Sequence, residues 1–65
     1  MELMKTMTVA QMMSEKCGEE IATEDVFKLP SKTREDEFEA YVARSENYIC
    51  LVQMYRNGDA RVYIV

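Results

Sequence analysis

The strongest constraint on the fold is the Asn57-Gly58 pair, because it lies between two apolar segments that resemble strands. An Asn-Gly pair in this setting is a strong signal for a β-hairpin with a two-residue type I′ turn. The flanking segments are residues 47–56, NYICLVQMYR, and residues 59–65, DARVYIV. We therefore predict an antiparallel hairpin whose last strand finishes on Val65, with no polar tail behind it.

A two-residue loop fixes the register of this hairpin and decides which side chains share a face of the sheet. In that register Gln53 faces Val62 and Val52 faces Tyr63. One face then holds the predicted core residues Ile49, Leu51, Val62 and Ile64. The other face is also apolar, and it consists of Cys50, Val52, Met54, Tyr63 and Val65, with Tyr48 nearby. A three-residue loop would shift the register and change these partners.

The amino-terminal part of the chain predicts one amphipathic helix over residues 9–17. Its apolar side recurs at helical spacing and consists of Val9, Met12, Met13 and Cys17. Thr8 suits the N-cap, because Gln11 follows three residues later as in a capping box. Gly18 suits the left-handed position that commonly ends a helix.

Two interpretations stay open for residues 33–45. The alternation of Phe38, Ala40 and Val42 with polar neighbours is typical of a strand, whereas the Glu and Ala content favours a helix. We favour the strand, because residues 45–47 then make a short turn into the next strand. Residues 1–65 form one small α+β domain in this interpretation, an N-terminal helix on an antiparallel three-stranded meander that ends in the C-terminal hairpin.

The composition argues against several classes of function. The chain has no His to bind zinc or to activate a serine, and its two glycines form no phosphate-binding loop. We therefore expect no enzyme, no metal site and no cofactor. The net charge of −4 opposes nucleic-acid binding, and no segment approaches the roughly 20 apolar residues that span a bilayer.

The two cysteines, Cys17 and Cys50, are too few for the disulfide framework of a secreted mini-protein. The amino terminus also lacks the apolar segment of a signal peptide. We predict a cytoplasmic chain with two reduced thiols, although a bond between these cysteines becomes possible if their elements touch.

The uncovered apolar face is the predicted partner-binding site, since apolar patches on small proteins commonly mark interactions. Its residues are Tyr48, Cys50, Val52, Met54, Tyr63 and Val65. We expect a protein-binding module that forms homo-oligomers and regulates or inhibits a larger protein, as small acidic phage proteins do. The alternative is a winged-helix DNA-binding regulator, which requires residues 33–45 to be helical and the hairpin to serve as the wing.

Overall fold

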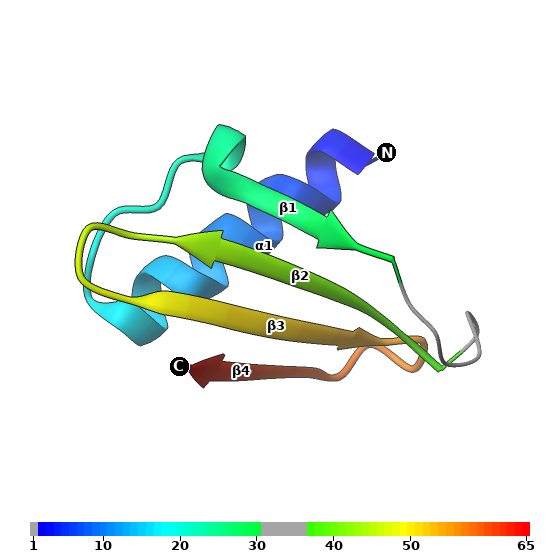
Figure 1. The fold of residues 1–65 in the computed structure, drawn as a ribbon. Coiled ribbons are helices and arrows are strands. Elements are labelled where there is room, and N and C mark those ends of the chain that lie inside the picture. The colour runs from blue at the N-terminus through cyan, green and yellow to red at the C-terminus, as the bar shows by residue number, and fades with distance from the viewer. Residues whose placement is uncertain (1, 31–36) are drawn as a thin grey trace.

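The computed structural model describes residues 2–30 and 37–65. It contains one long helix, a short 3₁₀ turn and four strands: α1 (Glu2–Cys17), η1 (Thr23–Asp25), β1 (Val26–Leu29), β2 (Phe38–Arg44), β3 (Ile49–Tyr55) and β4 (Ala60–Ile64). The strands form one antiparallel sheet in the order β1-β2-β3-β4, and α1 crosses one side of it (Figure 1). The predicted α+β fold is confirmed, with β1 added to the edge of the expected three-stranded meander.

The helix begins well before the predicted residue 9. Thr8 lies inside α1, where its Oγ1 donates a hydrogen bond to the Met4 carbonyl oxygen at 3.1 Å. The N-cap prediction for Thr8 is therefore wrong, because the preceding Glu, Leu, Met and Lys residues are good helix formers and extend the helix. The carboxyl end was predicted correctly: Gly18 has φ +73° and its N–H donates to the Ser14 carbonyl at 2.9 Å.

The structure decides the ambiguity of residues 33–45 where it describes them. Residues Phe38–Arg44 form β2, which pairs with β1 on one side and β3 on the other. The described part of the segment is therefore a central strand, and residues 33–36 lie outside the described residues. A winged helix needs a recognition helix here, so that alternative architecture is wrong.

The hairpin between β3 and β4 has a three-residue loop, not the predicted two-residue loop. Tyr55 N–H donates to the Asp59 carbonyl at 2.7 Å, and Gly58 N–H donates to the Tyr55 carbonyl at 3.0 Å. Gly58 has φ +97°, whereas Asn57 does not have a positive φ. A turn followed by one left-handed glycine is the usual three-residue hairpin. The predicted register is therefore wrong by one residue.

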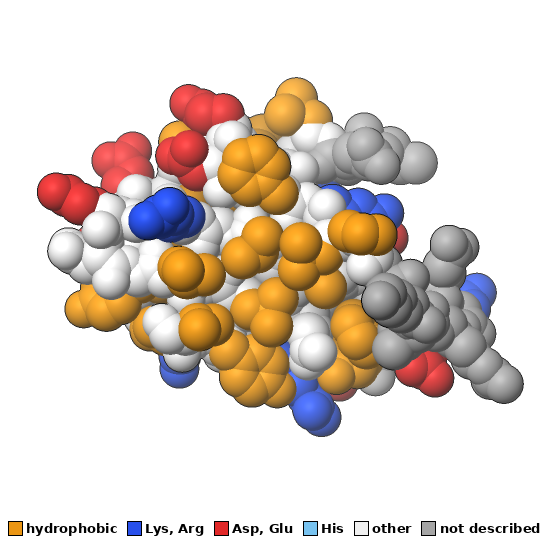
Figure 2. All heavy atoms as spheres, viewed as in Figure 1, with side chains coloured by type: hydrophobic (Ala, Val, Ile, Leu, Met, Phe, Trp, Pro, Cys, Tyr) orange, Lys and Arg blue, Asp and Glu red, His pale blue; other side chains and the backbone are white. Residues whose placement is uncertain are grey.

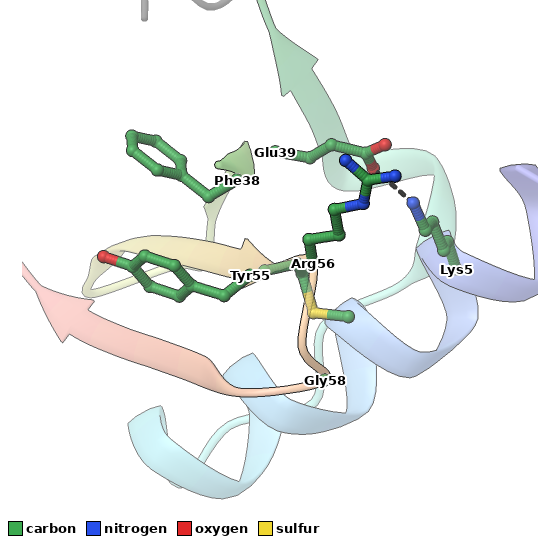
Figure 3. Close-up of a pocket in the computed structure, with 7 residues that line it drawn as sticks. Lys5, Phe38, Glu39, Tyr55, Arg56 and Gly58 are labelled. Atoms are coloured by element: carbon green, nitrogen blue, oxygen red, sulfur yellow. Dashed lines mark hydrogen bonds and ion pairs between the residues drawn. The ribbon is translucent and has the colours of Figure 1, made fainter. Parts of the chain in front are cut away.

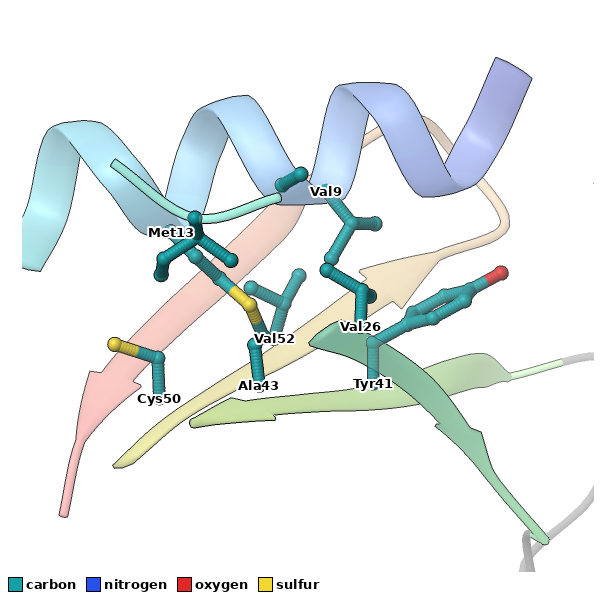
Figure 4. Packing of buried hydrophobic residues seen from close by; sticks show 9 residues of the cluster. Val9, Met13, Val26, Tyr41, Ala43, Cys50 and Val52 are labelled. Atoms are coloured by element: carbon teal, nitrogen blue, oxygen red, sulfur yellow. The ribbon is translucent and has the colours of Figure 1, made fainter. Parts of the chain in front are cut away.

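The new register changes which side of β3 belongs to the core, whereas Val62 and Ile64 of β4 stay on the core side as predicted. Val52 now faces Val62 and Cys50 faces Ile64. Both β3 residues are fully buried under α1, against Val9 and Met13 (Figure 4). The side of β3 predicted to be uncovered is thus the side that the helix covers.

A disulfide bond joins the end of α1 to this core. Cys17 and Cys50 are bonded across a sequence separation of 33 residues. The prediction of two reduced thiols is therefore wrong, because α1 continues to Cys17 and passes over the part of β3 that carries Cys50.

Candidate binding face

The side of the sheet opposite α1 carries an apolar row that crosses all four strands. Phe27 of β1 pairs with Val42 of β2, Val42 pairs with Leu51 of β3, and Leu51 pairs with Tyr63 of β4. Directly paired residues lie on the same side of a sheet. We call this row together with Leu29 and Ile49 the open face, so its residues are Phe27, Leu29, Val42, Ile49, Leu51 and Tyr63.

The open face is accessible on the described protein. Phe27 is 60% exposed, Tyr63 44% and Ile49 43%, while Val42 and Leu51 in the middle of the sheet are half-buried. In the orientation of Figure 1 the sheet lies in front of α1, and Figure 2 shows apolar side chains spread across this side. A continuous exposed apolar surface of this kind is typical of an interaction site.

The charged side chains on this side of the sheet are cationic. Arg44 and Arg61 occupy positions that point away from α1, and the Arg61 guanidinium lies 5.2 Å from the centre of the Tyr55 ring. That ring also packs against Phe38, with 5.4 Å between the ring centres. Among the residues of the four strands, the sole carboxylate is that of Glu39, which faces the helix side. The strands therefore present an apolar face with Arg44 and Arg61 as its charged residues, while Figure 2 shows Asp and Glu side chains beyond the strands at one edge of this side.

The predicted site residues are divided between the two sides. Tyr63 and Val65, which is 80% exposed, lie on the side of the open face, since Val65 N–H donates to the Ile49 carbonyl at 2.7 Å. Tyr48 is 41% exposed in the turn before β3. Cys50 and Val52 are buried beneath α1, and Met54 is half-buried on that same side.

The placement of Cys50, Val52 and Met54 on an uncovered face is therefore wrong, and the cause is the extra loop residue. Sequence reasoning also missed Phe27, Val42 and Leu51 as members of the exposed row. The alternation of Phe38, Ala40 and Val42 with polar neighbours could not reveal this, because such a pattern normally places the apolar residues towards the core.

A second feature lies on the helix side, where Glu39 ties α1 to the sheet. Its carboxylate accepts a hydrogen bond from Lys5 Nζ at 2.6 Å and one from the Tyr41 hydroxyl at 2.7 Å. Lys28 Nζ lies further away, at 3.9 Å. The hydrogen bond from Lys5, followed by that from Tyr41, lowers the pKa of Glu39 below its usual value of 4.5.

The comparisons with known proteins add no class to this description. No family model matches the chain, and no curated protein or solved structure matches it. None of the helices in residues 2–30 and 37–65 has the length and apolar character needed to cross a membrane.

Proposed function

We propose that the chain is a non-enzymatic protein-binding module that associates with a second copy of itself through the open face. The observation that carries the proposal is the apolar row Phe27–Val42–Leu51–Tyr63, which crosses the whole sheet without cover from the described residues. Burial of such a row is favourable, at about 25 cal/mol per Å² of apolar surface removed from water.

The size of the face supports a second copy as the occupant. Four strands about 4.8 Å apart span roughly 19 Å, and their lengths of four to seven residues correspond to about 13–23 Å at about 3.3 Å per residue. Packing two such faces together buries on the order of 1,000 Å² in total, which is the lower range for a specific interface. The result is a sandwich of two sheets about 10 Å apart, with one helix on each outer side.

The charge distribution also permits this arrangement. No acidic residue from 15 to 25 lies on a strand: Glu15 is on α1, Glu24 and Asp25 are on η1, and Glu19 and Glu20 lie between these elements. Repulsion between two copies of net charge −4 therefore acts mainly from the edges of the contact, where salt screens it. Association should accordingly strengthen as the ionic strength rises.

Sedimentation of the full chain at micromolar concentrations tests the proposal. We expect a dimer for the natural chain and a monomer for the double variant Leu51→Ser/Tyr63→Ser, which removes two paired residues of the row. The matched control is Met4→Ser/Met7→Ser, because Met4 (75%) and Met7 (56%) are exposed apolar residues on α1. A natural chain that stays monomeric, or a control that dissociates as readily as the double variant, would contradict the proposal.

A regulatory or inhibitory role towards a larger protein stays a prediction, as does the cytoplasmic location. The small number of cysteines was one reason for predicting that location, and the Cys17–Cys50 bond weakens this reason, because disulfides persist mainly in oxidising compartments. Trapping free thiols in the native host with an alkylating reagent tests the location: an unmodified chain indicates an oxidising compartment.

A further inference from the structure

A groove at the amino-terminal end of α1 extends around the end of the sheet and contains none of the six open-face residues. The groove has two lobes, of about 500 and 620 Å³, and the side chains of Lys5, Glu39 and Met54 line both. Figure 3 shows the larger lobe, with the Lys5–Glu39 ion pair on one side and Phe38 and Tyr55 on the other. These volumes fall in the range of sites that hold small molecules.

The smaller lobe has an apolar lining that the fold leaves in contact with solvent. Met4 and Thr8 of α1 lie on one wall, and Tyr41 and Met54 of the sheet lie on the other. Met4 is 75% exposed. Methionine side chains are flexible and adapt to an apolar ligand of irregular shape.

The charges at this lobe favour an anion. Two ammonium groups, those of Lys5 and Lys28, meet the single carboxylate of Glu39, so the lobe is positive within an acidic chain. Lys5 holds Glu39 closely at 2.6 Å, whereas Lys28 lies 3.9 Å away and its side chain is 51% exposed. Lys28 can therefore turn to a second carboxylate without breaking the closer ion pair.

We propose that this groove binds a small aliphatic carboxylate. Its charged group pairs with Lys28 at the rim, and its hydrocarbon chain lies between Met4 and Met54. Binding removes apolar surface of Met4 and Met54 from water and involves no open-face residue. The site is therefore independent of the proposed self-association.

Titration of the full ¹⁵N-labelled chain with octanoate, followed by NMR, tests the site. We expect saturable shifts at the amides of Lys5, Lys28 and Met54. Octylammonium, which has the same chain length and the opposite charge, should bind more weakly. Lys28→Glu should weaken octanoate binding by about fivefold, in line with the modest strength of one exposed ion pair.

Two further variants separate the site from general effects of charge and folding. Lys16→Glu changes the net charge by the same amount as Lys28→Glu. Lys16 lies on α1 beside a different hollow, which Met12 and Val62 also line, so this variant should leave octanoate affinity unchanged. Met4→Ser should weaken binding without unfolding the chain, since Met4 is exposed. Shifts that appear on the open face, equal binding of octylammonium, equal effects of Lys28→Glu and Lys16→Glu, or no saturable shifts would each overturn the proposal.

Discussion

The two faces of the sheet are both apolar, yet only one of them is part of the core. On the helix side, Val52 and Cys50 are fully buried with Met13 of α1. On the open face, Tyr63 and Ile49 are more than 40% exposed. Because side chains alternate along a strand, neighbours such as Leu51 and Val52 experience different surroundings.

This difference shows that a single helix can complete only one side of a small sheet. The helix side has a helix, a disulfide bond and an ion pair between Lys5 and Glu39. The open face has the row of paired apolar residues and no helix of the described chain over it. Along β3, the residues on the helix side should therefore stabilise the protomer, and the alternate residues on the open face should support association.

The largest effect is expected when one charge is placed on either side of β3. Val52→Asp should leave the chain unfolded, because an unpaired buried charge costs several kcal/mol and a domain of this size has about 3–5 kcal/mol of stability. Leu51→Asp should stay folded at a cost of about 1 kcal/mol and should lose self-association. Circular dichroism and urea unfolding measure the first effect, and sedimentation measures the second. Equal unfolding by both variants would show that the two faces do not differ.

Reduction of the disulfide should have the next largest effect. The Cys17–Cys50 bond closes a loop of 33 residues, for which loop-entropy arguments give about 3–4 kcal/mol of stabilisation. Urea unfolding with and without a reducing agent measures the loss. Cys17→Ser is the control, since its stability should already be low and should not change on reduction. An unchanged midpoint for the natural chain would show that the helix side does not depend on this bond.

The α+β fold and the existence of the hairpin were predictable because they depend on local signals. Asn57-Gly58 marks the turn, and Gly18 marks the end of the helix. The start of α1 was predicted wrongly because Thr8 and Gln11 have the spacing of a capping box, although Thr8 lies inside the helix. There its hydroxyl donates a hydrogen bond to the Met4 carbonyl oxygen. Local sequence alone does not separate these two positions.

The register was not predictable because Asn-Gly fits two hairpin loops that differ by one residue. In the observed loop the side chain of Asn57 accepts a hydrogen bond from Asp59 N–H at 3.0 Å, and Gly58 alone takes the left-handed conformation. The observed loop places Val62 opposite Val52, on the helix side, where Val62 packs against the core; the predicted register would have placed Val62 opposite Gln53. One loop residue therefore moved Cys50, Val52 and Met54 from the predicted binding site to the helix side.

The glycine that sets this register gives a smaller effect. Gly58 has φ +97° and no atom within 4 Å of where a Cβ would lie, so Gly58→Ala costs backbone energy but causes no clash. We expect a loss of about 1–2 kcal/mol, measured by urea unfolding. Gly58→Asn is the matched control and should lose less, because asparagine tolerates the left-handed region better. A stability for Gly58→Ala equal to that of the natural chain would mean that the loop can adopt a turn without positive φ, and the register would then need direct measurement.

The smallest effect concerns the ion pair that joins α1 to the sheet. The pKa of Glu39 is lowered in the folded chain by Lys5 and then by Tyr41, so its contribution to stability is present above the usual value of 4.5. That contribution is lost as the pH falls through the lowered pKa of the folded state. Because the Glu39 side chain is 30% exposed and Lys5 is 48% exposed, we expect less than about 1 kcal/mol.

Glu39→Gln should therefore be less stable than the natural chain at neutral pH and should approach it in acid, below pH 4.5. High salt should reduce the difference at neutral pH, since exposed pairs are screened. Glu15→Gln controls for the change in net charge, because it removes an exposed carboxylate of α1 that is not part of this ion pair. If the stabilities of both variants have the same pH dependence, the Lys5–Glu39 pair adds nothing to stability beyond the effect of net charge. The helix side would then be held by apolar packing and the disulfide alone, and the covering helix with its disulfide would be what distinguishes it from the open face.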